Sequence, residues 1–225
     1  MNCITMDNIS FGYTDDLVLE DLNLSMNTGD LVTLIGENGS GKSTILKLIL
    51  GEIKPQKGKI TILGQDSNKM SSYREIGYVP QMNIVNAMAF PVTCLELVVL
   101  NLYEDFGFIK IPKKRHKEKA IKIMEEMGLR QYLNVPFNEL SGGLMQRVMI
   151  TRAMINSPKI LIMDEPTAGV DQESKENFFK FIEDLNENND ISILLVTHEL
   201  DMVKEYLKLD HVFRVKNGDV EDVVI

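Results

Sequence analysis

One short segment of the chain has the residue types and the spacing of a phosphate-binding loop. Residues 36–44, GENGSGKST, match the pattern G-x-x-x-x-G-K-[ST] with Gly36, Gly41, Lys42 and Ser43. Glycines let successive backbone N–H groups point inward at a phosphate, and the dipole of a following helix adds to their field. We expect Lys42 to reach the β- and γ-phosphates of a nucleotide and the Ser43 hydroxyl to ligate Mg²⁺. The remaining residues of the segment are predicted to line the same site: Asn38, Gly39, Ser40 and Thr44.

Two acidic residues follow an apolar run that is typical of a buried strand. Asp164 and Glu165 come directly after ILIM at residues 160–163. Neighbouring side chains at the end of a strand diverge, so the two carboxylates can have different roles. We predict that Asp164 faces the metal ion and that Glu165 accepts a proton from the attacking water. The alternative is a pair of solvated acids in a turn, which the phosphate-loop pattern in the same chain disfavours.

Two further polar residues lie where a predicted strand meets a loop. Gln81 ends IGYVPQ and His198 ends ILLVTH. In open parallel sheets, ligands bind at the carboxyl ends of the strands, so both residues are candidates for sensing the γ-phosphate. A structural role with internal hydrogen bonds is the alternative for each. His116 and His211 have no comparable setting, and we expect both at the surface.

A Ser-Gly-Gly tripeptide precedes an amphipathic run at residues 143–156. Ser141 is predicted to cap this helix, with its hydroxyl accepting a hydrogen bond from the N–H groups of the first turn. Gly142 and Gly143 each weaken a helix by roughly 1 kcal/mol against alanine. Glycines at a helix N-terminus would allow the backbone to approach an anion closely. The pattern suggests an anion site without saying which chain holds the anion.

The arrangement of the predicted elements indicates an α/β fold with a parallel sheet. Strand-like runs occur at residues 31–35, 59–63, 76–80, 159–164, 191–197 and 211–215. Helix-like runs near 43–50, 172–188 and 199–208 alternate with the most apolar strands. Residues 82–156 instead carry helical patterns near 93–103, 115–127 and 143–156. We therefore predict one domain, residues 1–225, with an ATP-binding core at 1–81 and 157–225 and a helical insertion at 82–156.

Composition and charge exclude several classes of protein. The chain has 225 residues and a formal charge of −9, which argues against a general nucleic-acid-binding protein. Cys3 and Cys94 lack paired or metal-binding spacing, so we expect free thiols in a reducing compartment. The N-terminus lacks a signal-peptide pattern, and no apolar run reaches the roughly 20 residues that span a bilayer. The basic run KKRHKEK (113–119) is interpreted as a solvated helix face, or else as a contact with lipid head groups or a partner.

Over essentially its full length the chain resembles the ATP-binding-cassette ATPases. The segments that carry the resemblance are GENGSGKST, YVPQ, LSGGLMQR, ILIMDEPTAGVD and LLVTH, in that order. The resemblance implies a P-loop NTPase (RecA-like) core, an N-terminal antiparallel β subdomain, and ATP with Mg²⁺ as cofactors. It implies that Tyr13, in SFGY, stacks on adenine and that Gln81 also contacts the metal. Ser141, Gly142 and Gly143 would face the ATP held by a second copy, and Asp171 would lie between the two sites.

The chain departs from the family pattern at two positions, and it is most similar to one branch of the family. Leu144 replaces the usual glutamine, and a leucine side chain cannot hydrogen-bond to a nucleotide. The loop before Asp171 has Ala168 in place of a serine, which removes a hydroxyl. The chain is similar to zinc and manganese uptake ATPases, which implies a membrane permease docked near residues 82–91. It further implies an external substrate-binding protein and a cytoplasmic location, peripheral at the inner face of the cell membrane. A different importer or exporter, a soluble cassette ATPase and a non-catalytic nucleotide-gated module remain as alternatives.

Overall fold

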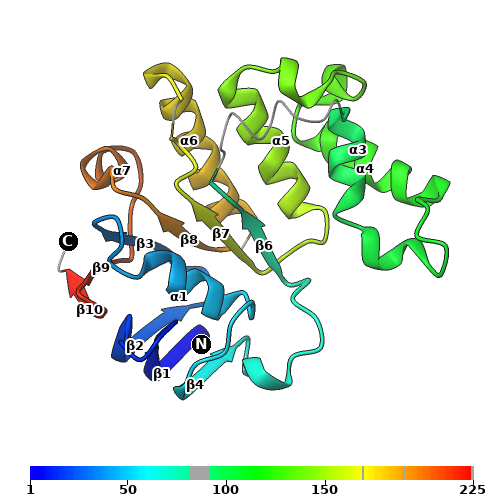
Figure 1. The fold of residues 1–225 in the computed structure, drawn as a ribbon. Helices are drawn as coiled ribbons and strands as arrows, with labels where there is room; N and C mark the ends of the chain where they lie inside the picture. Colours follow the sequence, from blue (N-terminus) through cyan, green and yellow to red (C-terminus); the bar gives the residue numbers. More distant parts are fainter. Residues whose placement is uncertain (82–91, 169, 190, 224–225) are drawn as a thin grey trace.

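A six-stranded sheet forms the centre of the molecule. The computed structural model describes residues 1–81, 92–168, 170–189 and 191–223. The strand order is β10-β9-β3-β8-β7-β6, with β10 (Asp219–Val223) antiparallel to its neighbour. The other strands run parallel: β3 (Leu31–Gly36), β6 (Ile76–Val79), β7 (Ile160–Asp164), β8 (Ser192–Val196) and β9 (His211–Lys216). The predicted parallel α/β core is confirmed (Figure 1).

Both faces of this sheet are buried, each under its own cluster of apolar side chains. Along β7, Leu161 and Met163 belong to one cluster, whereas Ile160 and Ile162 belong to the other. Burial on both faces explains why these strands are apolar at consecutive positions. One face is covered by α5 (Gly142–Met154), α6 (Gln172–Asn189) and α7 (Leu200–Tyr206), and the other by α1 (Lys42–Ile49) and a second sheet.

The second sheet has the order β2-β1-β4-β5 and is antiparallel throughout. Its strands are β1 (Asn2–Phe11), β2 (Leu19–Asn27), β4 (Lys57–Ile62) and β5 (Gln65–Asp66), followed by the 3₁₀ turn η1 (Ser67–Lys69). The buried side chains of β1 and β2 share one cluster with those of α1. The antiparallel N-terminal part that the family resemblance implied is confirmed, and it holds α1 and the preceding loop against the central sheet.

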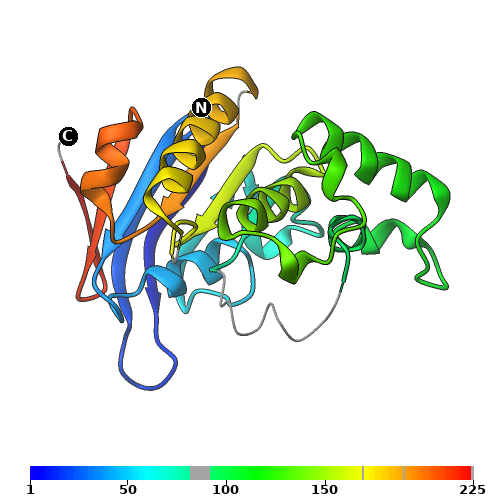
Figure 2. The ribbon, with the colours of Figure 1, turned by 90° about the horizontal axis from the view of Figure 1, so that it is seen from above.

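A layer of helices lies to one side of the central sheet (Figure 2). It contains α3 (Cys94–Leu100), α4 (Lys114–Glu126), α5 and the 3₁₀ turns η2 (Tyr103–Phe106), η3 (Arg130–Tyr132) and η4 (Phe137–Glu139). At the start of α3, Thr93 and Glu96 form a reciprocal capping box, which fixes where the helix begins. The predicted helical insertion is confirmed for the residues described here. Its exact boundaries, 81/82 and 156/157, remain predictions.

The expectation for His116 was wrong. This side chain is buried, with its ring 5.0 Å from the ring of Phe106, and its Nδ1 accepts the backbone N–H of Lys113 at 2.9 Å. The aromatic partner comes from η2, which a reading of the helix alone does not reveal. His211 is partly exposed and lies 3.1 Å from Asp222. Among the described residues, no helix is both long and apolar enough to cross a membrane.

Candidate active site

The phosphate-loop segment connects β3 to α1, as the pattern predicted. Lys42 begins α1, and its Nζ donates to the carbonyl oxygens of Gly36 at 2.7 Å and Glu37 at 3.0 Å. The side chain is largely buried, so its ammonium is held at the mouth of the loop. No acidic residue occupies the first turn of α1, whose free N–H groups face the loop. This end of the helix is therefore electrostatically suited to an anion.

Glycines in the loop are required by close contacts and by backbone conformation. A Cβ on Gly36 would lie 2.5 Å from the Val215 carbonyl oxygen and 2.6 Å from Ser40 Oγ. Gly41 has φ of 113°, a conformation that residues with a side chain rarely adopt. The Ser40 hydroxyl is buried and has no hydrogen-bond partner among the described residues. An unsatisfied hydroxyl inside a glycine-lined loop fits a phosphate oxygen as its partner.

Two carboxylates stand at the end of β7. Burial raises the pKa of Asp164, the neighbouring charge of Glu165 raises it further, and Lys42 opposes the shift. The backbone of Glu165 has φ of 46°, and its N–H donates to the Val196 carbonyl at 2.9 Å. A left-handed conformation at a non-glycine residue costs roughly 1–3 kcal/mol and is found most often at functional sites. This left-handed residue ends the extended strand directly after Asp164.

Glu165 and His198 are in direct contact. Glu165 Oε2 lies 2.8 Å from His198 Nδ1. The glutamate side chain is 12% exposed, whereas the histidine side chain is 67% exposed. The histidine therefore covers the carboxylate on one side and still presents the rest of its ring to solvent. This pair can bind a water molecule and hold a transferred proton.

A single cleft of about 600 Å³ brings most of the predicted nucleotide residues together. Tyr13 lies at its rim, 56% exposed, with its ring edge-on to Phe11 at 5.0 Å. The predicted residues that line the cleft are Tyr13, Gly36, Asn38, Gly39, Gly41, Lys42, Ser43, Thr44, Gln81, Asp164, Glu165 and His198. Segments far apart in the sequence therefore meet at one edge of the sheet, where such a fold binds ligands.

The donor atoms of the cleft fit a magnesium ion bound together with a nucleotide. Ser43 and Gln81 offer neutral oxygen atoms and Asp164 offers a carboxylate, and Mg²⁺ prefers such oxygen ligands. Among the described residues, no group of three or more His, Cys, Asp or Glu could hold a metal ion by itself. That donor set suits Mg²⁺, which is usually bound through one or two carboxylates and the phosphates of its nucleotide.

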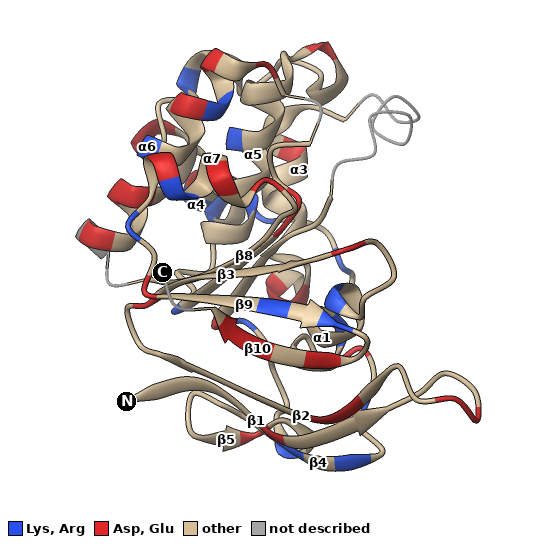
Figure 3. Ribbon diagram, turned by 90° about the vertical axis from the view of Figure 1, so that its left-hand side faces the viewer, with Lys and Arg blue, Asp and Glu red and all other residues tan. Residues whose placement is uncertain are grey.

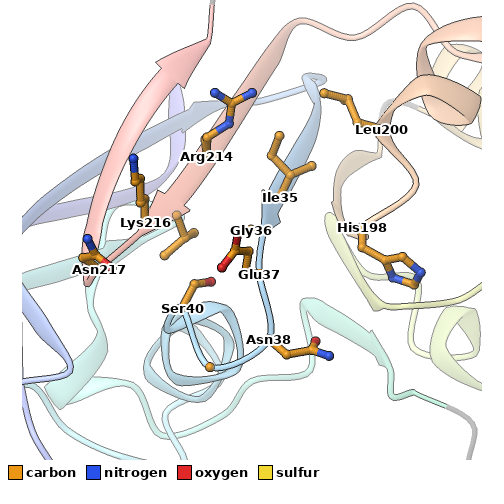
Figure 4. Close-up of a pocket in the computed structure, with 12 residues that line it drawn as sticks. Ile35, Gly36, Glu37, Asn38, Ser40, His198, Leu200, Arg214, Lys216 and Asn217 are labelled. Atoms are coloured by element: carbon orange, nitrogen blue, oxygen red, sulfur yellow. The ribbon is translucent and has the colours of Figure 1, made fainter.

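A second hollow of about 520 Å³ lies on the other side of the phosphate loop (Figure 4). It shares residues 36–39 and His198 with the cleft and is otherwise lined by side chains such as Leu200 and Arg214. Ser40, predicted to line the nucleotide site, lines this hollow and not the cleft. Neither Lys42 nor a β7 carboxylate lines it. The chemistry of the site therefore belongs to the cleft that contains Lys42, Asp164 and Glu165.

The Ser-Gly-Gly segment forms a separate surface, away from this cleft. Ser141 is the N-cap residue of α5, but the prediction that its hydroxyl caps the helix was wrong, because that hydroxyl makes no capping hydrogen bond. Together with Gly143 and Leu144 it lines a pocket of about 350 Å³. A Cβ on Gly143 would lie 3.2 Å from Ser174, so a larger residue here would press on α6 and displace it by a few tenths of an ångström. Gly142 has no comparable packing constraint, and its backbone is exposed at an open surface.

Asp171 caps the helix that follows it. Its Oδ1 accepts the backbone N–H of Ser174 at 3.0 Å, and hydrogen bonds from Ser174 lower the pKa of the exposed Asp171 carboxyl. This contact gives Asp171 a structural role within the chain. The neighbouring Gly169 lies outside the described residues, as do residues 82–91, where we expected the permease to dock.

Two polar contacts near the site were not predicted from the sequence. The buried side-chain amide of Gln146, on α5, donates to the backbone carbonyl of Pro166, directly after Glu165. Glu199, directly after His198, accepts hydrogen bonds from Thr167 and Lys175. Burial disfavours the charged form of Glu199, but the hydrogen bonds from Lys175 and Thr167 outweigh it and lower the pKa. One signal in the sequence could have identified Gln146: it is a polar residue at a position of the helix that is buried.

Comparison with known proteins agrees with this geometry. The ABC transporter family matches residues 19–168. The zinc uptake system ATP-binding protein ZurA of Listeria monocytogenes serovar 1/2a is 37% identical, over 97% of this chain and 84% of that protein. The manganese transport system ATP-binding protein MntB of Bacillus subtilis is 34% identical, over 98% and 88%.

A solved structure of a bacterial ABC transporter cassette in dimeric form is similar in fold. Its TM-score is 0.77 at 28% identity, and the match covers 97% of this chain and 96% of that one. The family match, the length of the shared sequence and the similarity in fold all point the same way. The chain therefore belongs to the ABC transporter family, as an ATP-binding cassette that hydrolyses ATP.

Proposed function

We propose that this cassette powers a membrane permease that takes up zinc or manganese, working as a dimer around two Mg-ATP. The ATPase part of the proposal rests on the contact between Glu165 and His198 at the cleft that contains Lys42. The cargo part rests on similarity to zinc and manganese uptake cassettes along almost the whole chain. The cassette supplies the energy, and its permease selects the ion.

The residues of the cleft fall into three groups: those that bind the phosphates and adenine, those that bind the metal ion, and the general base with the groups that position it. Lys42 and the loop amides bind the β- and γ-phosphates, and the exposed ring of Tyr13 stacks on adenine. Ser43, Gln81 and Asp164 would hold the metal ion. When bound, Mg²⁺ supplies charge that neutralises the phosphate oxygens as the bond to the leaving group breaks.

Hydrolysis itself requires one proton acceptor and one group that positions it. The oxygen of water bonds to the γ-phosphorus, the bond to the bridging oxygen of ADP breaks, and Glu165 accepts the proton of the water. His198 holds the Glu165 carboxylate and presents its second ring nitrogen toward the γ-phosphate. Gln81, at the end of β6, orients the same water. In this scheme the leaving ADP remains bound to Lys42 and the loop.

The proposal assigns the Ser141–Gly143 surface to the ATP of a second copy. Ser141 has a hydroxyl that its own helix does not use, and Gly142 exposes its backbone. Neither residue lines the cleft of its own chain. A second copy placed antiparallel would bring these donors onto a bound γ-phosphate, with Asp171 between the two sites. Gly143 has an internal reason to be glycine, so the argument rests on Ser141 and Gly142.

The other partners follow from the family assignment. A permease would hold the cassette dimer at the cytoplasmic face of the cell membrane, and an external substrate-binding protein would deliver the ion to that permease. A cassette for another importer or an exporter would share the same ATP site. A soluble cassette ATPase is the remaining alternative, and it would not co-purify with a membrane protein.

Deleting the gene tests the cargo directly. Cells without this cassette should grow poorly when zinc or manganese is chelated, and adding back one of the two ions should restore growth. A chromosomal copy encoding Glu165→Gln should behave like the deletion, whereas wild type should not. Normal cellular zinc and manganese in the deletion strain, with no second uptake system present, would reject the metal assignment and leave the ATPase assignment standing.

A further inference from the structure

A turn at the outer end of the helical layer exposes large apolar side chains. Phe108 is fully exposed, and Ile109 and Ile111 are 76% and 62% exposed. The segment between α3 and α4 lies far from the central sheet in both views (Figures 1 and 2). Phenylalanine and isoleucine are among the residues most often buried, and adjacent exposed ones mark interaction surfaces.

The local backbone does not require these residue types. The N–H of Lys110 donates to the Gly107 carbonyl at 3.3 Å, and both residues have positive φ. Phe108 and Ile109 therefore occupy the two corners of a tight turn. Such positions are usually taken by Gly, Pro, Asn, Asp or Ser, which suit the turn conformations. Turn formation leaves the apolar corner residues unexplained.

Contacts on both sides hold the turn in place. Phe106, just before it, is buried against the ring of His116, and His116 in turn accepts the N–H of Lys113. Within the turn, Lys110 Nζ lies 4.6 Å from the centre of the Tyr103 ring. The apolar corners are therefore presented from a packed base rather than from an unsupported loop.

Cations surround the apolar turn. Between Phe106 and Lys117 the sequence has no acidic residue and five exposed cations: Lys110, Lys113, Lys114, Arg115 and Lys117. The acids just before the turn, Glu104 and Asp105, are each 2.8 Å from Arg74. Lys114 reaches Glu118 at 3.6 Å, an exposed pair that is worth little. Lys117 lies near enough to the Glu96 carboxyl to help lower its pKa. Among the described residues, Lys110, Lys113 and Arg115 form no ion pair with an acidic side chain.

The rest of the protein has the opposite charge. Taking these five cations away from the net charge of −9 leaves −14 on the remaining residues. Acidic residues are prominent on α6, α7 and β10 (Figure 3). The rest of the protein would therefore be repelled by an anionic surface, and any attraction to such a surface must come from this one segment. We name Phe108, Ile109, Ile111 and the five cations the basic apolar turn.

We propose that the basic apolar turn binds the surface of an anionic lipid bilayer. The three apolar side chains enter the head-group region, and the cations contact lipid phosphates around them. Apolar side chains with flanking Lys and Arg are the combination that binds anionic membrane surfaces. The proposal adds a direct lipid contact to the permease contact, and it does not depend on ATP hydrolysis.

Binding to protein-free vesicles tests the proposal with the whole chain. We expect co-sedimentation with vesicles of phosphatidylcholine and 30% phosphatidylglycerol, and much weaker binding to phosphatidylcholine alone. Lys113→Gln/Lys114→Gln should weaken binding roughly 25-fold, since each cation near an anionic surface contributes about fivefold. The matched control is Lys57→Gln/Lys59→Gln, which changes the net charge equally at exposed positions on β4.

The apolar half has its own test. Phe108→Ser/Ile109→Ser/Ile111→Ser should weaken binding to the anionic vesicles by roughly tenfold or more, because insertion depends on buried apolar area. ATPase activity in solution should be unchanged in every variant, which separates this proposal from the proposed function. The chain has no tryptophan, so Phe108→Trp provides a single fluorophore. Its emission should shift to the blue with anionic vesicles, while Leu17→Trp, in the exposed loop before β2, should not shift.

Several outcomes would overturn the proposal. Absence of binding to anionic vesicles would do so, and so would equal binding to neutral ones or equal loss in the β4 control. Binding only to vesicles that contain a permease, and to none without protein, would assign the turn to that permease and reject the lipid contact.

Discussion

The contact between Gln146 and Pro166 offers a sharp test of how α5 supports catalysis. Gln146 is 3% exposed, and its amide donates to the carbonyl of the residue that follows Glu165. Gln146→Met keeps an unbranched side chain of similar length but removes the donor. The Pro166 carbonyl would then lose this hydrogen bond in a buried turn that already contains the strained Glu165 backbone.

The expected size of the effect follows from that burial. Removing one partner of a buried hydrogen bond costs about 1–3 kcal/mol. For a chain of this size, each kcal/mol lowers the melting temperature by about 2–4 °C, so we expect a decrease of about 2–12 °C. A displacement near 1 Å at a catalytic group can cost a rate factor of roughly 10², so ATP hydrolysis should fall roughly ten- to hundredfold. ATP affinity should change little, because Lys42 and the loop are untouched.

The control uses another buried polar residue on the same helix. Thr151 Oγ1 donates to the Arg147 carbonyl at 2.7 Å, within α5 and without contact to the Glu165 turn. Thr151→Val should lose a comparable amount of stability yet hydrolyse ATP normally. The measurements are thermal unfolding and steady-state phosphate release, both at a temperature where each variant is folded. If the two variants hydrolysed ATP equally fast, the contact would serve stability only and the reasoning would be refuted.

Three further predictions concern the cleft and its support. Lys42→Ala removes the ammonium that lies at the loop, so ATP binding measured by calorimetry should weaken and phosphate release should fall to background; wild-type turnover would reject the assignment. Glu165→Gln should retain ATP affinity and lose roughly 10²–10⁴-fold in rate, as for loss of a general base, and a parallel loss of affinity would instead place Glu165 in the binding network. Glu199 has a lowered pKa, so its contribution to stability is full above the unfolded pKa of about 4.3 and is lost as pH falls through the lower folded value. Glu199→Gln should therefore be less stable than wild type at pH 7, with the difference shrinking in acid; a difference independent of pH would contradict the linkage.

Local sequence was sufficient to predict those parts of the site whose residues are neighbours in the chain. The phosphate loop could be predicted because its glycines, Lys42 and Ser43 act within one strand-to-helix connection. Asp164 and Glu165 could be predicted because a buried strand carries them to the sheet edge. The sequence predicted the strands and their parallel arrangement but not their order, since the pairing of β3 with β8 and β9 joins segments distant in sequence.

The sequence alone could not predict the side-chain partners that depend on contacts between distant segments. Gln146 meets Pro166 only because the fold brings α5 to the turn that follows β7, and no local pattern encodes that meeting. His116 is buried because Phe106, in another element, covers its ring. The Ser141 hydroxyl departs from its predicted capping role although the helix begins where expected. In each case the backbone element was predictable, and the partner of the side chain was not.

The most direct test of the account is whether one ATP site is built by two chains. With Glu165→Gln and ATP, the cassette should elute as a dimer in size-exclusion chromatography and as a monomer without nucleotide. Adding Ser141→Arg places a bulky side chain on the surface proposed to meet the γ-phosphate of the partner, so the dimer should be lost while the monomer still binds ATP. Gln131→Arg, an exposed change of the same kind elsewhere in the helical layer, should leave the dimer intact. An undiminished ATP-dependent dimer of the Glu165→Gln/Ser141→Arg protein would contradict the shared site.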